Sequence, residues 1–523
     1  MTETSGRTER VGGAAGAALA VSTSPSSPPS PSAEQCSALR TLLADAGFTA
    51  PAVCSRLGIA SIYDFISLRE GRSGGASIAD ALDVLIRLFM DVELVDGELV
   101  RQHVGLAGAG LLEEVGLLGV HAGDPGRVHA AFLLYPTEGL WIASDLNVSP
   151  DGPAHTVLTE DAVYPAITKN TRHFLASLPA TPCEDFLELC GGTGIAALLA
   201  SRYATRTWSV DITERATRFA RFNAALNGVT NITASRGDLY DAVPGQTFDR
   251  IVAHPPYMPA LEQKYIFRDG GEDGEQITRR IVAGLPERLR PGGRLYCTCM
   301  LTDRRATNAE HRIRAMLGDR ADEFDVLLVT ERLFPPTDYY FRLALTGRAE
   351  LGEVVRRHEV FQRLEVERLV YGSFVIQRPA VRRPTFTARR QAGAGTTVAD
   401  VEWLLGWEAE SAARTGEQPD DLRPVVSPAC RMRLGHAFAA GHWTVEDCQL
   451  TTSAPFALEA RCPPWTAVLL ERCDGTAGVE ALHGELRRSG ALPAALGLAE
   501  FTKLVRSLIS GGFLRLPGVL DTS

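Results

Sequence analysis

The chain contains very little lysine and no paired cysteine motif. Among its 53 basic residues only Lys169, Lys264 and Lys503 are lysines, so nearly all of the positive charge comes from arginine. None of the ten cysteines belongs to a C-x-x-C pair, which argues against zinc sites of the finger or ribbon type. We therefore expect reduced, mostly buried thiols in a cytoplasmic protein without a bound metal.

Long apolar runs and a basic excess are missing as well. No stretch approaches the roughly 18–20 apolar residues of a membrane span, so no membrane partner is expected. The net charge of −10 argues against a nucleic-acid binder that uses its whole surface, although it leaves a local basic patch open. A length of 523 residues predicts two to four domains.

Composition changes mark the ends of the chain. Residues 1–33 are rich in Gly, Ala, Ser and Pro and predict a disordered tail. Residues 34–150 combine helical patterns with two strands, 130–135 and 140–144, and predict a winged-helix-like N-terminal domain. A helical lid that only packs on the catalytic domain is the alternative interpretation of this region.

The C-terminal part is separated from the centre by a proline- and arginine-rich segment. Residues 381–395 predict a linker, and residues 396–523 predict a small winged-helix-like domain. Its expected helices are 465–472, 479–488 and 498–510, followed by a short strand after Gly511-Gly.

Residues 151–380 alternate strands with helices and predict an α/β, Rossmann-like domain with a seven-stranded, mostly parallel sheet. Helices are expected at 213–227 and 274–289, and residues 367–377 predict a last, antiparallel strand at the edge of the sheet. The other predicted strands are 185–189, 206–210, 232–235, 249–253, 293–299 and 325–330.

A glycine loop, Glu188-Leu-Cys-Gly-Gly-Thr-Gly194, follows the first of these strands. Gly191, Gly192 and Gly194 allow a nucleotide-like ligand to lie against the backbone where a strand turns into a helix. The carboxylate of Glu188 at the strand end can accept a hydrogen bond from an amino group of that ligand.

Two further acids follow later strand ends. Asp211 comes about twenty residues after the glycine loop, where a carboxylate binds ribose hydroxyls, and Ile212 follows it. Helix capping is the competing role for Asp211. Asp238 after the third strand can accept from an adenine amine, with Leu239 beside the ring.

The turn His254-Pro255-Pro256-Tyr257 is the most specific motif in the chain. Two prolines directly after a buried strand stiffen the backbone and direct the preceding side chain into a pocket. An aromatic ring after the prolines can stack on a flat substrate. An acceptor before them can hold a target N–H so that its lone pair faces a methyl donor.

In this order the motifs resemble class I S-adenosylmethionine (SAM)-dependent methyltransferases. They are most similar to the amino-methylating branch that includes release-factor glutamine and ribosomal RNA guanine-N2 methyltransferases. Asn223-Ala-Ala-Leu-Asn-Gly228 and Asp269-Gly-Gly-Glu-Asp-Gly274 extend the resemblance, which covers Tyr164 to Gln377. It implies SAM as the cofactor, direct methyl transfer to nitrogen, and a place beside the cofactor for Tyr164.

The chain departs from the family pattern at two positions. Cys190 stands where the first loop glycine is usual, and we expect it to be a packing residue of the cofactor site. His254 replaces the usual Asn, Asp or Ser. A neutral histidine can accept a hydrogen bond through one ring nitrogen, and it can also act as a base toward a more acidic target.

The substrate is the least defined part of the prediction. Residues 331–390 contain twelve arginines and seven acids, which slightly favours RNA or another nucleic acid as the partner. A protein glutamine, a peptide or a small natural product is the alternative substrate. A SAM-binding adaptor without turnover is the third interpretation, and the sequence predicts no oligomeric state.

Overall fold

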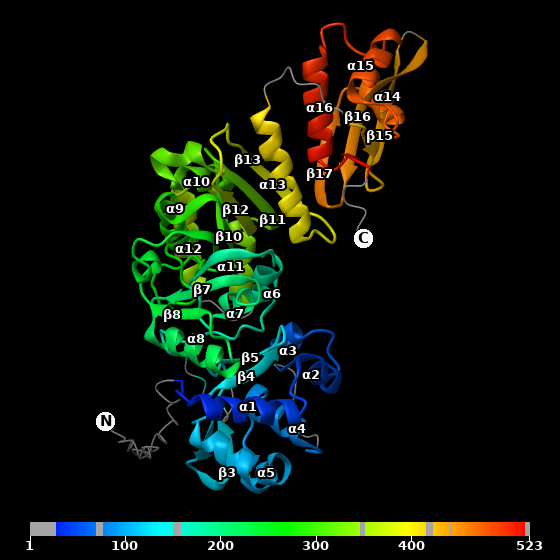
Figure 1. Ribbon diagram of the computed structural model, residues 1–523. Coiled ribbons are helices and arrows are strands. Elements are labelled where there is room, and N and C mark those ends of the chain that lie inside the picture. Colours follow the sequence, from blue (N-terminus) through cyan, green and yellow to red (C-terminus); the bar gives the residue numbers. More distant parts are fainter. Residues whose placement is uncertain are drawn as a thin grey trace, which may run out of the picture.

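The computed structural model describes residues 28–69, 77–149, 156, 158–345, 351–414, 422–439 and 441–517. Most of the predicted disordered tail, residues 1–27, lies outside these ranges. Figure 1 shows an N-terminal part (blue to cyan), a central α/β part (green) and a C-terminal part (orange to red) following one another along the molecule. Within the described ranges, no helix has the length and apolar character needed to cross a membrane.

An eleven-stranded sheet runs through the central and C-terminal parts, in the order β15-β16-β17-β13-β11-β12-β10-β9-β6-β7-β8. Strands β6 to β9 are parallel to their neighbours, and β10 is parallel to β9, as predicted. Their bounds are Cys183–Leu189 (β6), Ala204–Asp211 (β7), Ile232–Arg236 (β8), Phe248–Ala253 (β9) and Leu289–Arg304 (β10).

The predicted edge strand has the expected direction but the wrong position. Strand β12 (Val366–Gln377) is antiparallel to both β10 and β11 (Asp325–Phe334) and lies between them. Gly372 is required at this position, because a Cβ there would overlap the carbonyl oxygen of Val329 on β11. The sheet therefore continues beyond β12 to β11 and β13 instead of ending at β12.

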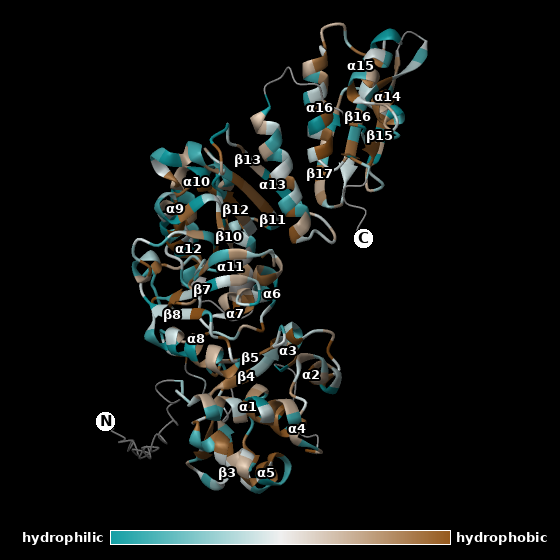
Figure 2. Cartoon of the chain, viewed as in Figure 1, coloured by the Kyte–Doolittle hydropathy of each residue, from teal (hydrophilic) through white to brown (hydrophobic). Residues whose placement is uncertain are grey.

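Helices cover both faces of the central sheet, and the strands between them are apolar. Figure 2 colours β11 and its neighbours mainly brown, and the outer helix α10 largely teal. The helices and short 3-10 turns of this part are α6 (Lys169–Ala176), α7 (Ile195–Ala200), α8 (Glu214–Leu226), η4 (Leu239–Ala242), α9 (Gln276–Arg288), α10 (Ala309–Met316), η5 (Gly318–Glu323), α11 (Pro336–Leu345) and α12 (Leu351–Arg363).

The segment predicted as a linker contains a strand. Strand β13 (Thr387–Ala392) runs parallel to β11 and connects the central sheet to β17. Its sequence lacks the alternation of apolar and polar residues that marks most strands. Ion pairs contribute to its stability instead. Arg389 contacts the buried carboxylate of Asp303, and Arg390 contacts Glu408.

The C-terminal part places three helices against the end of the sheet, as the sequence predicted. Phe501 and Ile509 of α16 form its core together with Leu450 of β16 and Leu469 of α14. The elements are α13 (Val398–Ala413), β14 (Val425–Val426), β15 (Arg431–Ala439), β16 (His442–Thr452), β17 (Phe456–Cys462), α14 (Trp465–Arg472), α15 (Val479–Arg488), α16 (Leu498–Ser510) and β18 (Leu514–Arg515). All ten cysteines of the chain are free.

The N-terminal part is built from short helices and two small sheets, β1-β3-β2 and β4-β5. The predicted hairpin is β4-β5, whereas the separate three-stranded sheet was not predicted. The elements are α1 (Ala33–Asp45), α2 (Ala50–Leu57), η1 (Ile62–Asp64), α3 (Phe65–Arg69), α4 (Ala81–Leu85), η2 (Ile86–Met90), β1 (Val95–Asp96), α5 (Gly97–Glu114), β2 (Leu118–His121), β3 (Asp124–Ala130), β4 (Leu133–Thr137) and β5 (Leu140–Ser144).

Two asparagines of the Asn223–Asn227 motif fix the N-terminal part to the central part. The fully buried amide of Asn223 accepts from the Ala143 N–H at 2.8 Å and donates to the carbonyls of Ala143 and Thr193. Asn227 makes the corresponding pair of bonds to Trp141. The edge of β5 is thereby held on α8, and the two parts share one apolar core.

We expect Asn223→Ala to lower the free energy of opening of this contact by roughly 2–4 kcal/mol, because buried backbone groups of β5 lose their partners. Hydrogen exchange of the β5 amides measures the effect, and exchange should become faster there. Arg218→Ala, an exposed position on the same helix, is the matched control. Unchanged β5 exchange in the Asn223 variant would contradict this account of the anchor.

Candidate functional site

A cavity of about 850 Å3 lies at the carboxyl ends of the parallel strands. It is located where β6 and β9 are neighbours and the strand order reverses, which is the usual ligand position in open α/β sheets. The structure brings together nearly all predicted site residues in its lining: Tyr164, Glu188, Cys190, Gly191, Gly192, Asp211, Ile212, Asp238, Leu239, His254, Pro255, Pro256 and Tyr257.

Gly194 is the predicted cofactor residue that does not line the cavity. It precedes α7 with a φ of +77°, and a Cβ there would approach the Ala220 side chain of α8 to 3.0 Å. Gly192 has a φ of +54° and almost open space beside it. Gly194 therefore serves helix packing, and Gly192 leaves room for a ligand.

Cys190 adopts a backbone conformation that normally favours glycine. Its φ is +57°, in the left-handed region. This explains the glycine that the family carries there, since a side chain strains the loop. Burial raises the pKa of the Cys190 thiol, so the residue is a neutral packing group, as the sequence predicted.

The Glu188 carboxylate is buried beneath the glycine loop. Its two oxygens accept hydrogen bonds from the backbone N–H groups of Ala196 and Ala197 at 3.1 and 3.0 Å. Burial raises the pKa of Glu188 to about 7, against the opposing effect of these bonds. A cationic group in the cavity would therefore meet a carboxylate that ionises near neutral pH.

Asp211 is held by the glycine loop and not used as a helix cap. Its Oδ2 accepts from the Gly192 N–H at 3.0 Å, and its Oδ1 accepts from the backbone and hydroxyl of Thr213. Thr213 itself caps α8 through the Ala216 N–H. Thr213 thus has the capping role that was the alternative for Asp211, and Asp211 is part of the cavity lining.

Asp238 forms an ion pair that the sequence did not predict. Its Oδ2 accepts from Arg280 of α9 at 2.9 Å, and both residues line the cavity. Leu239 beside it has a φ of +54°. Arg280 fixes the direction of the carboxylate, but no motif surrounds it that would have identified it.

The ring of His254 is enclosed by aromatic side chains. It stacks on Phe174 of α6 with ring centroids 5.2 Å apart and lies 5.7 Å from Tyr257. Its Nε2 is buried and has no hydrogen-bond partner among the described residues. Burial, assisted by the charge of His173, lowers the pKa of His254 to about 4, so the ring is neutral near pH 7.

Asn170 links two tyrosines and orients the His254–Tyr257 turn. Asn170 of α6 donates to the Tyr257 hydroxyl at 2.9 Å and accepts from the Tyr371 hydroxyl at 3.3 Å. Burial raises the pKa of Tyr371 to about 12, so it remains a hydrogen-bond donor. Neither Asn170 nor Tyr371 was identified from the sequence, because neither residue belongs to one of the motifs.

The N-terminal part also contributes to the cavity. Tyr63, Ile66 and Ser67 of η1 and α3 belong to its lining. Across the cavity mouth, Tyr164 stacks on Phe267 with centroids 5.2 Å apart. The N-terminal part therefore forms one wall of the cavity.

Glycines of the Asp269–Gly274 motif pack closely against the His254–Tyr257 turn. A Cβ at Gly270 would approach the Pro256 carbonyl to 2.7 Å, and one at Gly274 would overlap the Tyr257 carbonyl. Asp269 is buried and accepts from the backbone of Lys264 and Tyr265. The motif thus acts by close packing against the turn.

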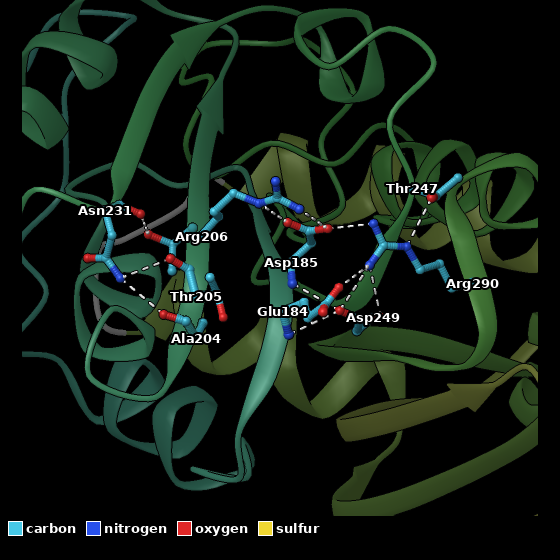
Figure 3. Close-up of polar contacts among 10 residues, drawn as sticks. Glu184, Asp185, Ala204, Thr205, Arg206, Asn231, Thr247, Asp249 and Arg290 are labelled. Atoms are coloured by element: carbon cyan, nitrogen blue, oxygen red, sulfur yellow. Dashed lines mark hydrogen bonds and ion pairs between the residues drawn. The ribbon is translucent and has the colours of Figure 1, made fainter.

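A cluster of three carboxylates, Glu184, Asp185 and Asp249, lies within metal-ligand distance at the opposite end of the strands. Figure 3 shows that arginine already neutralises it. Asp185 pairs with Arg206 at 2.6 Å and with Arg290 at 2.5 Å, and Arg290 also contacts Asp249. These ion pairs join β6, β7 and β9 at their amino ends.

The strand order, the glycine loop and the acids that follow successive strands define an α/β domain for a nucleotide-type cofactor. The carboxylates of Glu188, Asp211 and Asp238 line one cavity, and hydrogen-bond acceptors of this kind suit the ammonium, hydroxyl and amine groups of SAM. Residues 155–320 match the family model "Methyltransferase small domain". The resemblance to SAM-dependent methyltransferases is thereby confirmed for the central part of the chain.

Known relatives share the same part of the chain. It is 35% identical over 131 residues to the ribosomal protein uL3 glutamine methyltransferase of Bradyrhizobium diazoefficiens, covering 22% of this chain and 41% of that protein. It is 34% identical over 152 residues to the release factor glutamine methyltransferase of Cereibacter sphaeroides, covering 26% and 54%. The chain spans about half the length of the curated relatives it matches.

The chain also aligns with solved structures, at low TM-scores. The ribosomal protein L11 methylase of Lactobacillus delbrueckii subsp. bulgaricus aligns with a TM-score of 0.23 and 18% identity, covering 39% of this chain and 74% of that one. Trm5b of Pyrococcus abyssi aligns with a TM-score of 0.29 and 13% identity, covering 58% and 81%.

Proposed function

We propose that the chain is a SAM-dependent methyltransferase that methylates the side-chain amide nitrogen of a glutamine in a polypeptide. One observation carries the proposal: a single cavity is lined by both the acid-tipped glycine loop and the His254–Tyr257 turn. A methyl donor held by the loop and an acceptor held by the turn would share this space.

Three carboxylates would hold the cofactor, and SAM would supply a methyl group that its sulfonium already activates. Glu188 would accept from the ammonium of the methionine part, and Asp211 from the ribose hydroxyls. Asp238, oriented by Arg280, would accept from the adenine amine. A preformed set of acceptors of this kind holds the donor with little reorganisation on binding.

His254 and Tyr257 would position the acceptor nitrogen. The buried, unpartnered Nε2 of His254 can accept a hydrogen bond from one amide N–H, leaving the nitrogen directed toward the methyl group. The Tyr257 ring, fixed through Asn170, would cover the flat amide. With a pKa of about 4 His254 is a weak base, so alignment is its main contribution, and the proton that the methylated nitrogen must lose would pass to water.

Several observations favour a polypeptide over the nucleic acid that composition slightly favoured. The relatives reported above are named as glutamine methyltransferases of proteins. Among the arginines of residues 331–390 whose side chains the structure describes, most are paired with acids and present little free charge to phosphates. Their ion pairs include Arg357–Glu353, Arg363–Glu272, Arg368–Asp303, Arg378–Glu323, Arg383–Asp325 and Arg390–Glu408.

The terminal parts would present the polypeptide. Each combines helices with antiparallel strands, two small sheets in the N-terminal part and β15 to β17 of the large sheet in the C-terminal part, and we propose that both are winged-helix-like domains. The N-terminal part borders the cavity through Tyr63, and the C-terminal part ends in an open strand edge, β15. An open edge of this kind is able to take an extended peptide.

SAM affinity should depend on pH through Glu188. The carboxyl must ionise to hold an ammonium, so affinity should rise as pH increases through about 7 and then level off. Between pH 6 and pH 8 the ionised fraction grows roughly tenfold, and we expect a similar gain in affinity. Isothermal titration measures it, and Glu188→Gln should give a flat profile. A pH-independent affinity in the parent protein would count against the ammonium contact.

Mass spectrometry of polypeptides tests the substrate. Proteins of the source cell with and without this gene are compared for glutamines that gain one methylene. Such a residue should be present only with the gene, and acid hydrolysis should release its methyl group as methylamine, because the amide bond is cleaved. Methyl groups that stay on lysine, arginine or a nucleobase after hydrolysis would contradict the amide assignment.

A further inference from the structure

Strand β15 is the outer edge of the eleven-stranded sheet. Among the described strands it pairs only with β16, so one side of its nine residues presents backbone N–H and C=O groups without a neighbouring strand. The register shifts between Gly435 and His436, and the extra residue, Glu446, belongs to β16. Strand β15 itself therefore runs without an insertion, which suits pairing with another extended chain.

Large apolar side chains are exposed on the β15–β16 hairpin. Met432 is 42% exposed, Phe438 60% and Trp443 67%. The rings of Phe438 and Trp443 pack edge to face with centroids 5.3 Å apart. Exposed charged side chains such as arginine protect an edge strand against pairing with another chain. Three exposed apolar side chains give no such protection and are typical of a binding surface.

The edge strand and the segment before it are basic. Residues 422–439 contain three arginines and no Asp or Glu. Arg431 and Arg433 are exposed, and their described contacts are carbonyl and amide oxygens, with no carboxylate among the described residues. This differs from the arginines of 331–390, which are largely paired with acids.

We propose that β15 binds an extended acidic polypeptide segment as an added strand. The backbone edge supplies main-chain hydrogen bonds, Arg431 and Arg433 supply charge complementarity, and Phe438 with Trp443 supplies an apolar contact. A nucleic acid would match the charge but lacks the peptide N–H and C=O groups that an edge strand pairs with. The inference extends the proposed function, in which the terminal parts present the polypeptide, but peptide binding to β15 can be measured apart from methyl transfer because SAM takes no part in it.

Fluorescence anisotropy with the full chain tests the proposal. The probe is a short fluorescein-labelled peptide of alternating glutamate and valine. It should bind saturably, and combining Arg431→Glu with Arg433→Glu should weaken binding at least about tenfold. Combining Arg487→Glu with Arg488→Glu, the same charge change at two exposed positions of α15, should leave binding unchanged.

A second probe distinguishes the contribution of backbone hydrogen bonds to binding from the contribution of charge. The same peptide N-methylated at every residue keeps its side-chain charge but cannot donate main-chain hydrogen bonds, so it should bind much more weakly. Hydrogen exchange of the β15 amides should slow when the first peptide binds. Equal binding of the two peptides, no peptide binding, or binding only of oligouridylate that the double variant abolishes would each overturn the proposal.

Discussion

Replacing His254 by alanine is expected to lower turnover about a hundredfold while the affinity for SAM stays within about twofold. The loss follows from geometry, because the acceptor nitrogen would no longer be held in line with the methyl group. In the proposed arrangement SAM would contact Glu188, Asp211 and Asp238, which the substitution does not change. Single-turnover methyl transfer and isothermal titration measure the two quantities separately.

His254→Asn is the matched variant. Asparagine occupies this position in many members of the family and can both accept and donate, so it should retain turnover within about tenfold of the parent. If alanine at this position changed nothing, the site would not be catalytic, and the SAM-binding adaptor would become the better account.

Asp211→Ala is expected to raise the dissociation constant of SAM at least tenfold. Losing hydrogen bonds to two ribose hydroxyls costs roughly 1.5–3 kcal/mol. The same carboxylate also holds the Gly192 N–H and Thr213, so part of the effect comes from a looser glycine loop. Isothermal titration measures the affinity change.

Thr213→Val separates these two contributions. It removes the hydroxyl contact to Asp211 and the side-chain cap of α8 but leaves the carboxylate in place. SAM affinity should then fall much less than in Asp211→Ala. Unchanged affinity in Asp211→Ala would show that the ribose lies elsewhere.

Local sequence patterns were sufficient to predict the central sheet and most of the site. Strands β6 to β9 are short apolar runs, and Glu188, Asp211 and His254 each follow or end one of them. Parallel strands bring their carboxyl ends to one edge, so side chains distant in sequence were predicted to meet there. The cavity lining bears out that convergence.

What local patterns cannot encode is how distant segments pair. Strand β12 was predicted at the edge because its direction can be inferred locally, whereas its insertion between β10 and β11 depends on the whole sheet. Strand β13 resembles a linker because Arg389 and Arg390 interrupt it, and their acidic partners lie far away along the chain. Tyr63 reaches the cavity from another part of the fold, and no motif marks it.

The most direct test of the central claim is transfer of labelled methyl from SAM by the purified chain into lysate of source cells that lack the gene. The products are divided by their sensitivity to protease and to nuclease. We predict label that protease removes and nuclease does not, incorporated about a hundredfold more slowly by the His254→Ala variant. Label that only nuclease removes would contradict polypeptide methylation and identify a nucleic acid as the substrate.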